Sequence, residues 1–155
     1  YLHSSVSINT AVNKANSVRS IHLDNLNKMY AGLYYLREEE DNSEGGDLVL
    51  YRWNKNLTEE DKIKIIQEDD FHNNCEAFSE IKYKPNTFVF FLNNLDALHG
   101  VSMRGVTNYS RNFFYFAGIY GSNLFEVNQY KSGFINKMQL KLKKIFFNKK
   151  ILWIN

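Results

Sequence analysis

The stretch that decides the fold is VRSIHLD, residues 18–24, which continues after a short polar break into MYAGLYYL, residues 29–36. Both segments are rich in β-branched and aromatic residues, so each is predicted to form a strand. His22 and Asp24 stand two residues apart, and side chains with this spacing lie on one face of a strand. The pattern therefore places an imidazole and a carboxylate beside each other.

Short strands separated by turn signals are also predicted along the rest of the chain. Gly45-Gly46 and Pro85-Asn86 each predict a tight turn. No regular alternation of strands and helices is visible, which argues against a parallel sheet and favours a mostly β sandwich or jelly roll. The further predicted strands are residues 47–53, 78–83, 87–92, 99–103 and 112–120, with an eighth if residues 6–10 pair.

Two segments read as helices. Residues 57–67 are predicted to be a short surface helix capped by Thr58. Residues 128–150 are predicted to form a basic, helical segment in which lysines are mixed with apolar residues such as Phe146 and Phe147. Such a helix packs its apolar side on its own sheet, or it lies on a membrane or a partner.

Length and composition set further expectations. The 155 residues suit one domain, residues 1–155, with a core at about 16–122. The net charge of +2 gives no case for nucleic-acid binding, and no apolar run is long enough to span a membrane. The single cysteine, Cys75, excludes an internal disulfide and fits a cytoplasmic location. Because the chain opens at Tyr1, we expect a trimmed form or a piece of a longer protein; the oligomeric state is left open.

A third metal ligand has to come from elsewhere in the chain. The remaining histidines are His3 at the terminus, His72 in a polar loop, and His99 at the entry of a predicted strand. Two histidines and one carboxylate form the facial triad of non-haem iron(II) oxygenases, which leaves three coordination positions open. The alternatives are a hydrogen-bonded strand histidine for His22, a turn-capping role for Asp24 and a loop position for His99.

The surrounding sequence resembles the prolyl-4-hydroxylase-like group of Fe(II)- and 2-oxoglutarate-dependent oxygenases. The resemblance extends over residues 18–120. Its elements, in order, are His22 and Asp24, Tyr35-Leu36, the acidic residues 38–41, Gly45-Gly46-Asp47-Leu48, Pro85-Asn86, residues 88–91, His99-Gly100-Val101, and Arg111.

This resemblance implies a double-stranded β-helix, or jelly roll, with a few flanking helices. It implies that His22, Asp24 and His99 hold Fe(II), and that the enzyme is a dioxygenase. In the implied reaction O2 and 2-oxoglutarate are consumed, a substrate C–H bond is hydroxylated, and succinate and CO2 are released. Ascorbate is a further expected reductant, and the substrate is a peptidyl proline or a small molecule.

The resemblance also assigns cosubstrate and substrate residues. Arg111 matches the basic residue that anchors the distal carboxylate of 2-oxoglutarate, and Tyr35 matches a tyrosine that donates to the same carboxylate. Arg104 competes with Arg111 for this role, and a solvated surface arginine is the alternative for both. Tyr30, Trp53 and Arg104 lie in segments expected to border the mouth and are candidates for substrate binding.

Two rival functions stay open. One is a cupin-like metal-binding jelly roll without 2-oxoglutarate chemistry, which would need no buried arginine facing the metal. The other is a non-catalytic binding module on the same fold. An intact triad together with Arg111 argues against the second rival.

Overall fold

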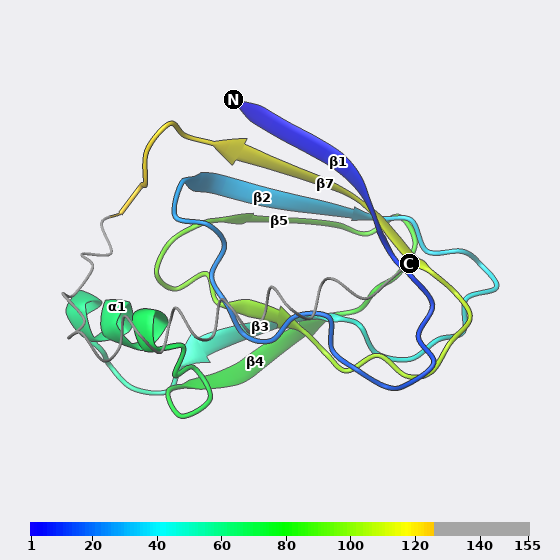
Figure 1. Cartoon of the computed structure of the whole chain (residues 1–155), viewed down its shortest axis with the longest axis horizontal. Helices are drawn as coiled ribbons and strands as arrows, with labels where there is room; N and C mark the ends of the chain where they lie inside the picture. The colour runs from blue at the N-terminus through cyan, green and yellow to red at the C-terminus, as the bar shows by residue number, and fades with distance from the viewer. Residues whose placement is uncertain (126–155) are drawn as a thin grey trace, which may run out of the picture.

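A computed structural model describes residues 1–125 of the chain, so the predicted C-terminal helix lies outside the described residues. Two antiparallel sheets face each other as the layers of a sandwich (Figure 1). The four-stranded sheet has the order β1 (Leu2–Asn9), β7 (Arg111–Ile119), β2 (Lys28–Tyr35), β5 (Phe88–Leu92), and the three-stranded sheet has the order β4 (Cys75–Ile81), β3 (Leu48–Trp53), β6 (His99–Val101). This arrangement confirms the predicted jelly roll.

Most predicted strands are confirmed, with boundaries that move by a few residues. The predicted pairing near the N-terminus also exists, because β1 pairs antiparallel with β7 from Leu2 to Asn9. The predicted strand at residues 18–24 is wrong. His22 forms an isolated bridge with His99 there, and the neighbouring residues are irregular. In place of the predicted strand, one bridge holds His22 beside the three-stranded sheet.

Two apolar clusters hold the sandwich together. Tyr35, Leu48, Tyr83 and Val89 form the first cluster between the sheets. The second consists of Ile21, Phe71 and Leu98, and the partly buried Ile65 and Ile66 of helix α1 (Glu59–Glu68) pack against it. Helix α1 therefore braces the segments that carry His22 and His99. Within residues 1–125 no helix is long and apolar enough to cross a membrane.

Thr58 caps helix α1, as the sequence predicts. Its side chain accepts a hydrogen bond from the Asp61 backbone, and the Asp61 carboxylate accepts one from the Thr58 backbone, which makes a capping box. We expect Thr58→Ala to lower the free energy of unfolding by about 1 kcal/mol, since the first turn loses a bonded partner. Urea denaturation measures this loss. Thr58→Ser keeps the hydroxyl and serves as the control, and equal midpoints for the alanine and serine variants would contradict the cap.

Candidate metal and cosubstrate site

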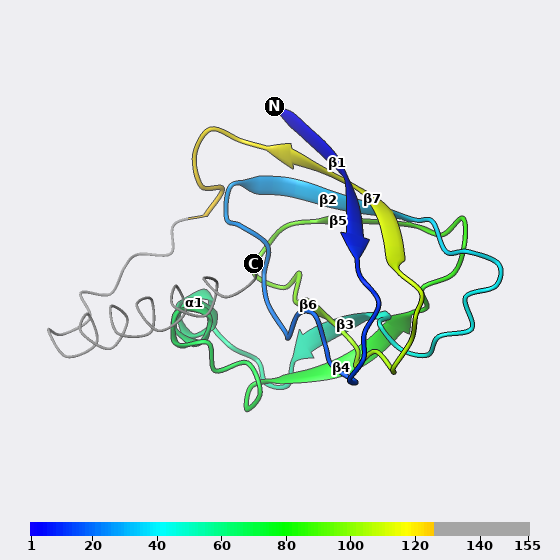
Figure 2. The ribbon, with the colours of Figure 1, turned by 45° about the vertical axis from the view of Figure 1, so that its right-hand side comes forward.

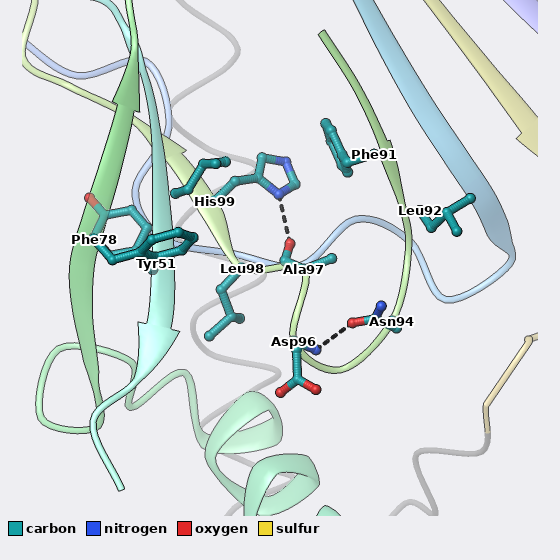
Figure 3. Close-up of a pocket in the computed structure, with 10 residues that line it drawn as sticks. Tyr51, Phe78, Phe91, Leu92, Asn94, Asp96, Ala97, Leu98 and His99 are labelled. Carbon is teal, nitrogen blue, oxygen red and sulfur yellow. Dashed lines mark hydrogen bonds between the residues drawn. The ribbon is translucent and has the colours of Figure 1, made fainter.

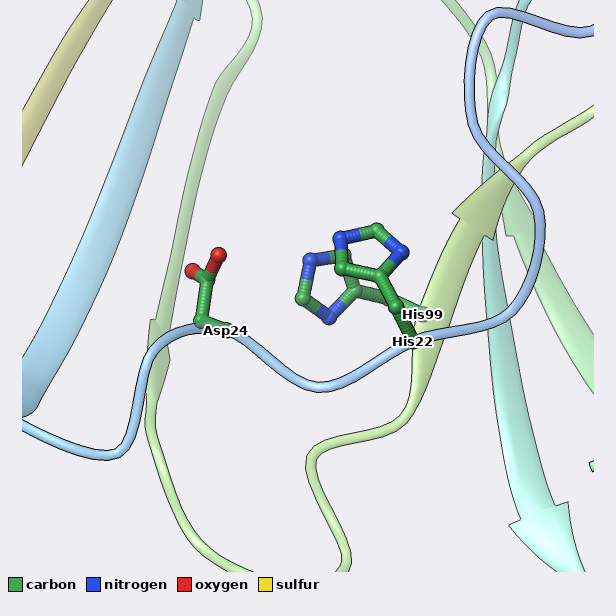
Figure 4. A group of neighbouring side chains, drawn as sticks. All are labelled: His22, Asp24 and His99. Carbon is green, nitrogen blue, oxygen red and sulfur yellow. The ribbon is translucent and has the colours of Figure 1, made fainter. Parts of the chain in front are cut away.

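His22, Asp24 and His99 converge at one point between the sheets (Figure 4). Each offers a ligand atom, and the three ligand atoms lie within 4.8 Å of one another. The two imidazole rings have centroids 4.3 Å apart. Reciprocal backbone hydrogen bonds between His22 and His99, of 2.9 and 3.1 Å, hold the two histidines in register. The bridge that replaces the predicted strand is therefore what brings two ligands together from distant parts of the chain.

The second nitrogen of each imidazole fixes the orientation of the ring. His22 Nδ1 lies 2.8 Å from the Ser20 carbonyl, and His99 Nδ1 lies 2.9 Å from the Ala97 carbonyl. A carbonyl can only accept, so each Nδ1 carries the proton and each Nε2 keeps its lone pair. Such a carbonyl behind the ring is the usual support of a metal-bound histidine. The donor set of two neutral imidazoles and one carboxylate fits Fe(II).

Burial keeps both imidazoles neutral. It lowers the pKa of His22 to about 4, with help from the neighbouring His99, and it also lowers the pKa of His99. A protonated histidine nitrogen cannot bind a metal, so the lowered pKa values of both histidines favour metal binding at neutral pH.

The metal-free chain should therefore lose stability in acid. The pKa of His22 is about 4 when folded and about 6.5 when unfolded, so the unfolded state binds more protons between these values. We expect the free energy of unfolding to fall as the pH drops from about 6.5 toward 4. Urea midpoints at several pH values measure this, and His22→Gln should flatten the dependence. A parent and a variant with the same pH dependence would contradict it.

Asp24 is buried, with 5% of its surface exposed, and its Oδ1 accepts a hydrogen bond of 2.9 Å from the Lys28 ammonium. Lys28 begins β2, where a register shift between Lys28 and Tyr30 aims its side chain inward. The ammonium also lies 5.1 Å from the centre of the Tyr115 ring. Lys28 thus neutralises the buried carboxylate and leaves Asp24 Oδ2 as the oxygen to offer to a metal.

Arg111 and Tyr35 lie together on the inner side of the four-stranded sheet. Arg111 is 4% exposed and its guanidinium stacks over the rings of Tyr35 and Tyr83, at 5.1 and 4.6 Å. Arg111 forms no ion pair within residues 1–125, and its buried Nε has no acceptor there. The buried Tyr35 hydroxyl interacts with the guanidinium itself, and the Asp47 carboxylate attracts the guanidinium without forming an ion pair with it. A buried, unpaired cation is costly, so this pair of donors is suited to an incoming carboxylate.

Glycine at position 46 makes room for Arg111. A Cβ built on Gly46 would lie 3.3 Å from Arg111 Nη1. Gly45 and Gly46 both have left-handed φ values, of 74° and 71°, which a side chain would strain. The Gly pair therefore uses the backbone freedom that the sequence predicts, although residues 41–47 form no regular turn, and it lets the loop approach the guanidinium closely.

The other candidate residues do not gather at the triad. Arg104 is buried, and its guanidinium donates to the carbonyls of Thr10 and Tyr109, so it ties loops together. The surface alternative for the two arginines is therefore wrong. The Tyr30 ring packs against Phe90 and over Gly118 on the outer side of the four-stranded sheet, away from the triad, which argues against contact with substrate.

A cavity of about 240 Å³ opens beside His99. Tyr51 and Phe78 border one side and Phe91 and Leu92 the other, so its walls are largely apolar (Figure 3). A second hollow, of about 440 Å³, shares Tyr51 and Phe78 with the first and continues to Trp53 and Leu57. Trp53 thus lines the approach to His99, and its indole is held by a hydrogen bond to the Leu95 carbonyl.

Sequence reasoning missed Lys28, Tyr83 and Tyr115 at this site. Tyr83 forms one wall of the Arg111 pocket, where its hydroxyl donates to the Asn112 carbonyl and accepts from the Asn112 amide. Lys28 carries one sequence signal, since it is the charged residue that opens an otherwise apolar aromatic strand. Tyr115 is one of many tyrosines in the chain, and nothing in the sequence distinguishes it.

The family comparison agrees with this geometry. The model of the 2OG-Fe(II) oxygenase superfamily matches residues 9–116, which is more than half of the chain. The chain therefore belongs to the 2OG-Fe(II) oxygenase superfamily, a family of oxidoreductases that use Fe(II) and 2-oxoglutarate. The matched span contains the triad and Arg111. No curated protein matches the chain.

Proposed function

We propose that this chain is an Fe(II)- and 2-oxoglutarate-dependent dioxygenase that hydroxylates a C–H bond of its substrate. His22, Asp24 and His99 hold the iron, and Arg111 with Tyr35 binds the distal carboxylate of 2-oxoglutarate. The observation that carries this proposal is the convergence of three ligand atoms within 4.8 Å, with both imidazoles oriented by backbone carbonyls. Bound iron supplies the activation of O2 and the oxidative decarboxylation of 2-oxoglutarate to succinate.

The protein's own residues prepare this chemistry by holding charge and geometry. The Lys28 ammonium balances the charge of the Asp24 carboxylate and fixes its orientation. Because the lowered pKa values of His22 and His99 keep both imidazoles neutral, neither has to lose a proton before it binds a metal at neutral pH. An incoming carboxylate would give Arg111 a counter-charge in direct contact and would give the Tyr35 hydroxyl an anionic acceptor. Arg111 also supports this function over a cupin-like site without 2-oxoglutarate, which would have no use for a buried unpaired cation.

The substrate group that enters beside His99 is compact and apolar in this proposal. The cavity there is walled by Tyr51, Phe78, Phe91 and Leu92, which favour hydrocarbon over charge. A prolyl ring fits this description, in keeping with the prolyl-4-hydroxylase-like group, and so does a small apolar molecule. Trp53 lies on the approach and is proposed to contact the rest of the substrate.

Uncoupled turnover tests the proposal without knowledge of the substrate. The full chain is incubated with Fe(II), ascorbate, O2 and 2-oxoglutarate, and succinate is measured beside a sample in which Zn(II) replaces Fe(II). We expect slow, iron-dependent succinate formation, together with binding of 2-oxoglutarate to the Mn(II)-loaded protein in calorimetry. Absence of both succinate and metal-dependent binding would overturn the proposal.

A further inference from the structure

The four-stranded sheet has an outer face that is turned away from β3 and β4 (Figure 2). This outer face carries many exposed apolar side chains. Residues that pair across neighbouring strands point to the same side of a sheet. Val6 pairs with Phe114, and Gly32 pairs with Phe90 on one side and with Phe116 on the other, so these side chains share one face. We call this surface the outer apolar face. Its exposed members are Leu2, Val6, Ile8, Phe88, Phe90, Leu92 and Phe114, with exposed fractions of 46–67%.

Strand β1 has the reverse of the usual pattern. Its inward positions are polar, with His3, Ser5 and Ser7 opposite the inward-facing residues of β7. Three of its four outward positions, Leu2, Val6 and Ile8, are apolar, and the fourth is Ser4. A strand with one solvated face normally turns its apolar residues to the core. The reversal indicates that the outer apolar face is covered by further protein.

Two glycines make room for aromatic rings on the outer apolar face. Side chains are missing at Gly32 and Gly118, where a Cβ would collide with the rings of Phe116 and Tyr30. The Phe88 and Phe116 rings consequently stack across the sheet, with centroids 5.4 Å apart and planes at 12°. The apolar side of a helix can pack on such a layer of aromatic rings.

We propose that the C-terminal segment of this chain, residues 126–155, covers the outer apolar face as an amphipathic helix. Phe134, Ile135, Met138, Leu142 and Ile145 follow the spacing of one helical face. Twenty helical residues extend about 30 Å, and β7, with its 9 residues, also extends about 30 Å. The segment is thus long enough to run the length of the sheet.

The position and charge of the two ends of the sheet support this occupant. Strand β7 ends at Ile119, so the chain leaves the sheet at that end, and the exposed Glu38, Glu39 and Glu40 follow β2 at the opposite end (Figure 1). A helix that runs back along the sheet brings its last lysines toward these acidic residues. Those lysines are Lys143, Lys144, Lys149 and Lys150. The segment therefore offers apolar contacts along the face and opposite charge at its far end.

Amide hydrogen exchange of the full chain, read by mass spectrometry, tests this packing. The outer-face variant is Phe90→Lys with Phe114→Lys, and the control is Met103→Lys with Val106→Lys, at loop positions that are at least as exposed. We expect the amides of residues 134–152 to be protected in the parent and in the control. In the outer-face variant they should exchange at least about tenfold faster. Val6→Ser, on the edge strand, repeats the test without adding charge.

The protection of β3 amides shows in each variant that the sandwich is still folded. Exchange of residues 134–152 at the unprotected rate in the parent would overturn the proposal. Protection that neither the double variant nor Val6→Ser changes would also overturn it, because the segment would then pack elsewhere. Protection that grows with protein concentration, with a dimer mass in light scattering, would show that a second copy covers the face instead.

Discussion

Replacing His99 with alanine is expected to abolish iron-dependent succinate formation. His99 is 8% exposed, its ring is oriented by the Ala97 carbonyl, and its backbone holds His22 in place. The alanine variant keeps the backbone bridge and loses one of three ligands. Loss of a supporting residue behind a ligand costs roughly 10–100-fold, so loss of a ligand should cost at least about 100-fold in metal affinity. Mn(II) titration measures the affinity, and succinate measures turnover.

His72→Ala is the matched control, because His72 is exposed in a loop outside the triad. It should bind Mn(II) and form succinate as the parent does. Full turnover by His99→Ala would exclude the triad as the iron site. Loss of metal binding in both variants would show that metal binding depends on His72 as well, which the triad does not predict.

Arg111→Met is expected to remove the affinity for 2-oxoglutarate while metal binding is retained. A carboxylate bound to a buried arginine loses about 3–5 kcal/mol when the arginine is removed, which corresponds to at least about 100-fold in the dissociation constant. The ligand-free variant should be as stable as the parent or more stable, because burial already disfavours the charge of Arg111, and it has no ion-pair partner within the described residues. This opposite change in stability distinguishes a cosubstrate anchor from a structural arginine.

Calorimetry with the Mn(II)-loaded protein measures the affinity for 2-oxoglutarate, and thermal unfolding measures the stability. Arg52→Met is the control, since Arg52 is exposed and paired with Glu76. Arg111→Lys keeps the charge but not the planar fork and should fall between the parent and Arg111→Met. Unchanged affinity in Arg111→Met would assign the anchor to another residue.

The family and the general architecture could be predicted from the sequence because their signals are local. Dense aromatic residues predicted β2 and β7, alternating apolar and polar residues predicted β3, and Thr58 followed by acidic residues predicted the start of α1. The shared position of His22 and Asp24 and the special backbone at Gly45 and Gly46 could also be predicted, since each depends on neighbours along the chain. The jelly roll, the single helix in the described part and the grouping of His22 with Asp24 all followed from such patterns.

The segment at residues 18–24 could not be predicted from local sequence patterns. Its composition predicted a strand, but a strand needs a partner along its whole length. Here β6 forms one isolated bridge, between His99 and His22, and adds one backbone hydrogen bond from Val101 to Arg19. Tyr30 and Tyr35 could not be sorted either, since both are aromatic residues of one strand, and the register decides which faces the core.

The sequence by itself determined the superfamily, the sandwich of short strands and the residue types of the metal site. The tertiary structure decided that Arg111 is buried without an ion-pair partner among residues 1–125 while Arg104 ties loops together, and that Lys28 holds the Asp24 carboxylate. It also decided that β1 turns its apolar side outward. The physical reason is that burial, pairing of charges and the side a residue faces depend on segments far apart in the chain, whereas turns, caps and periodicity depend on neighbours.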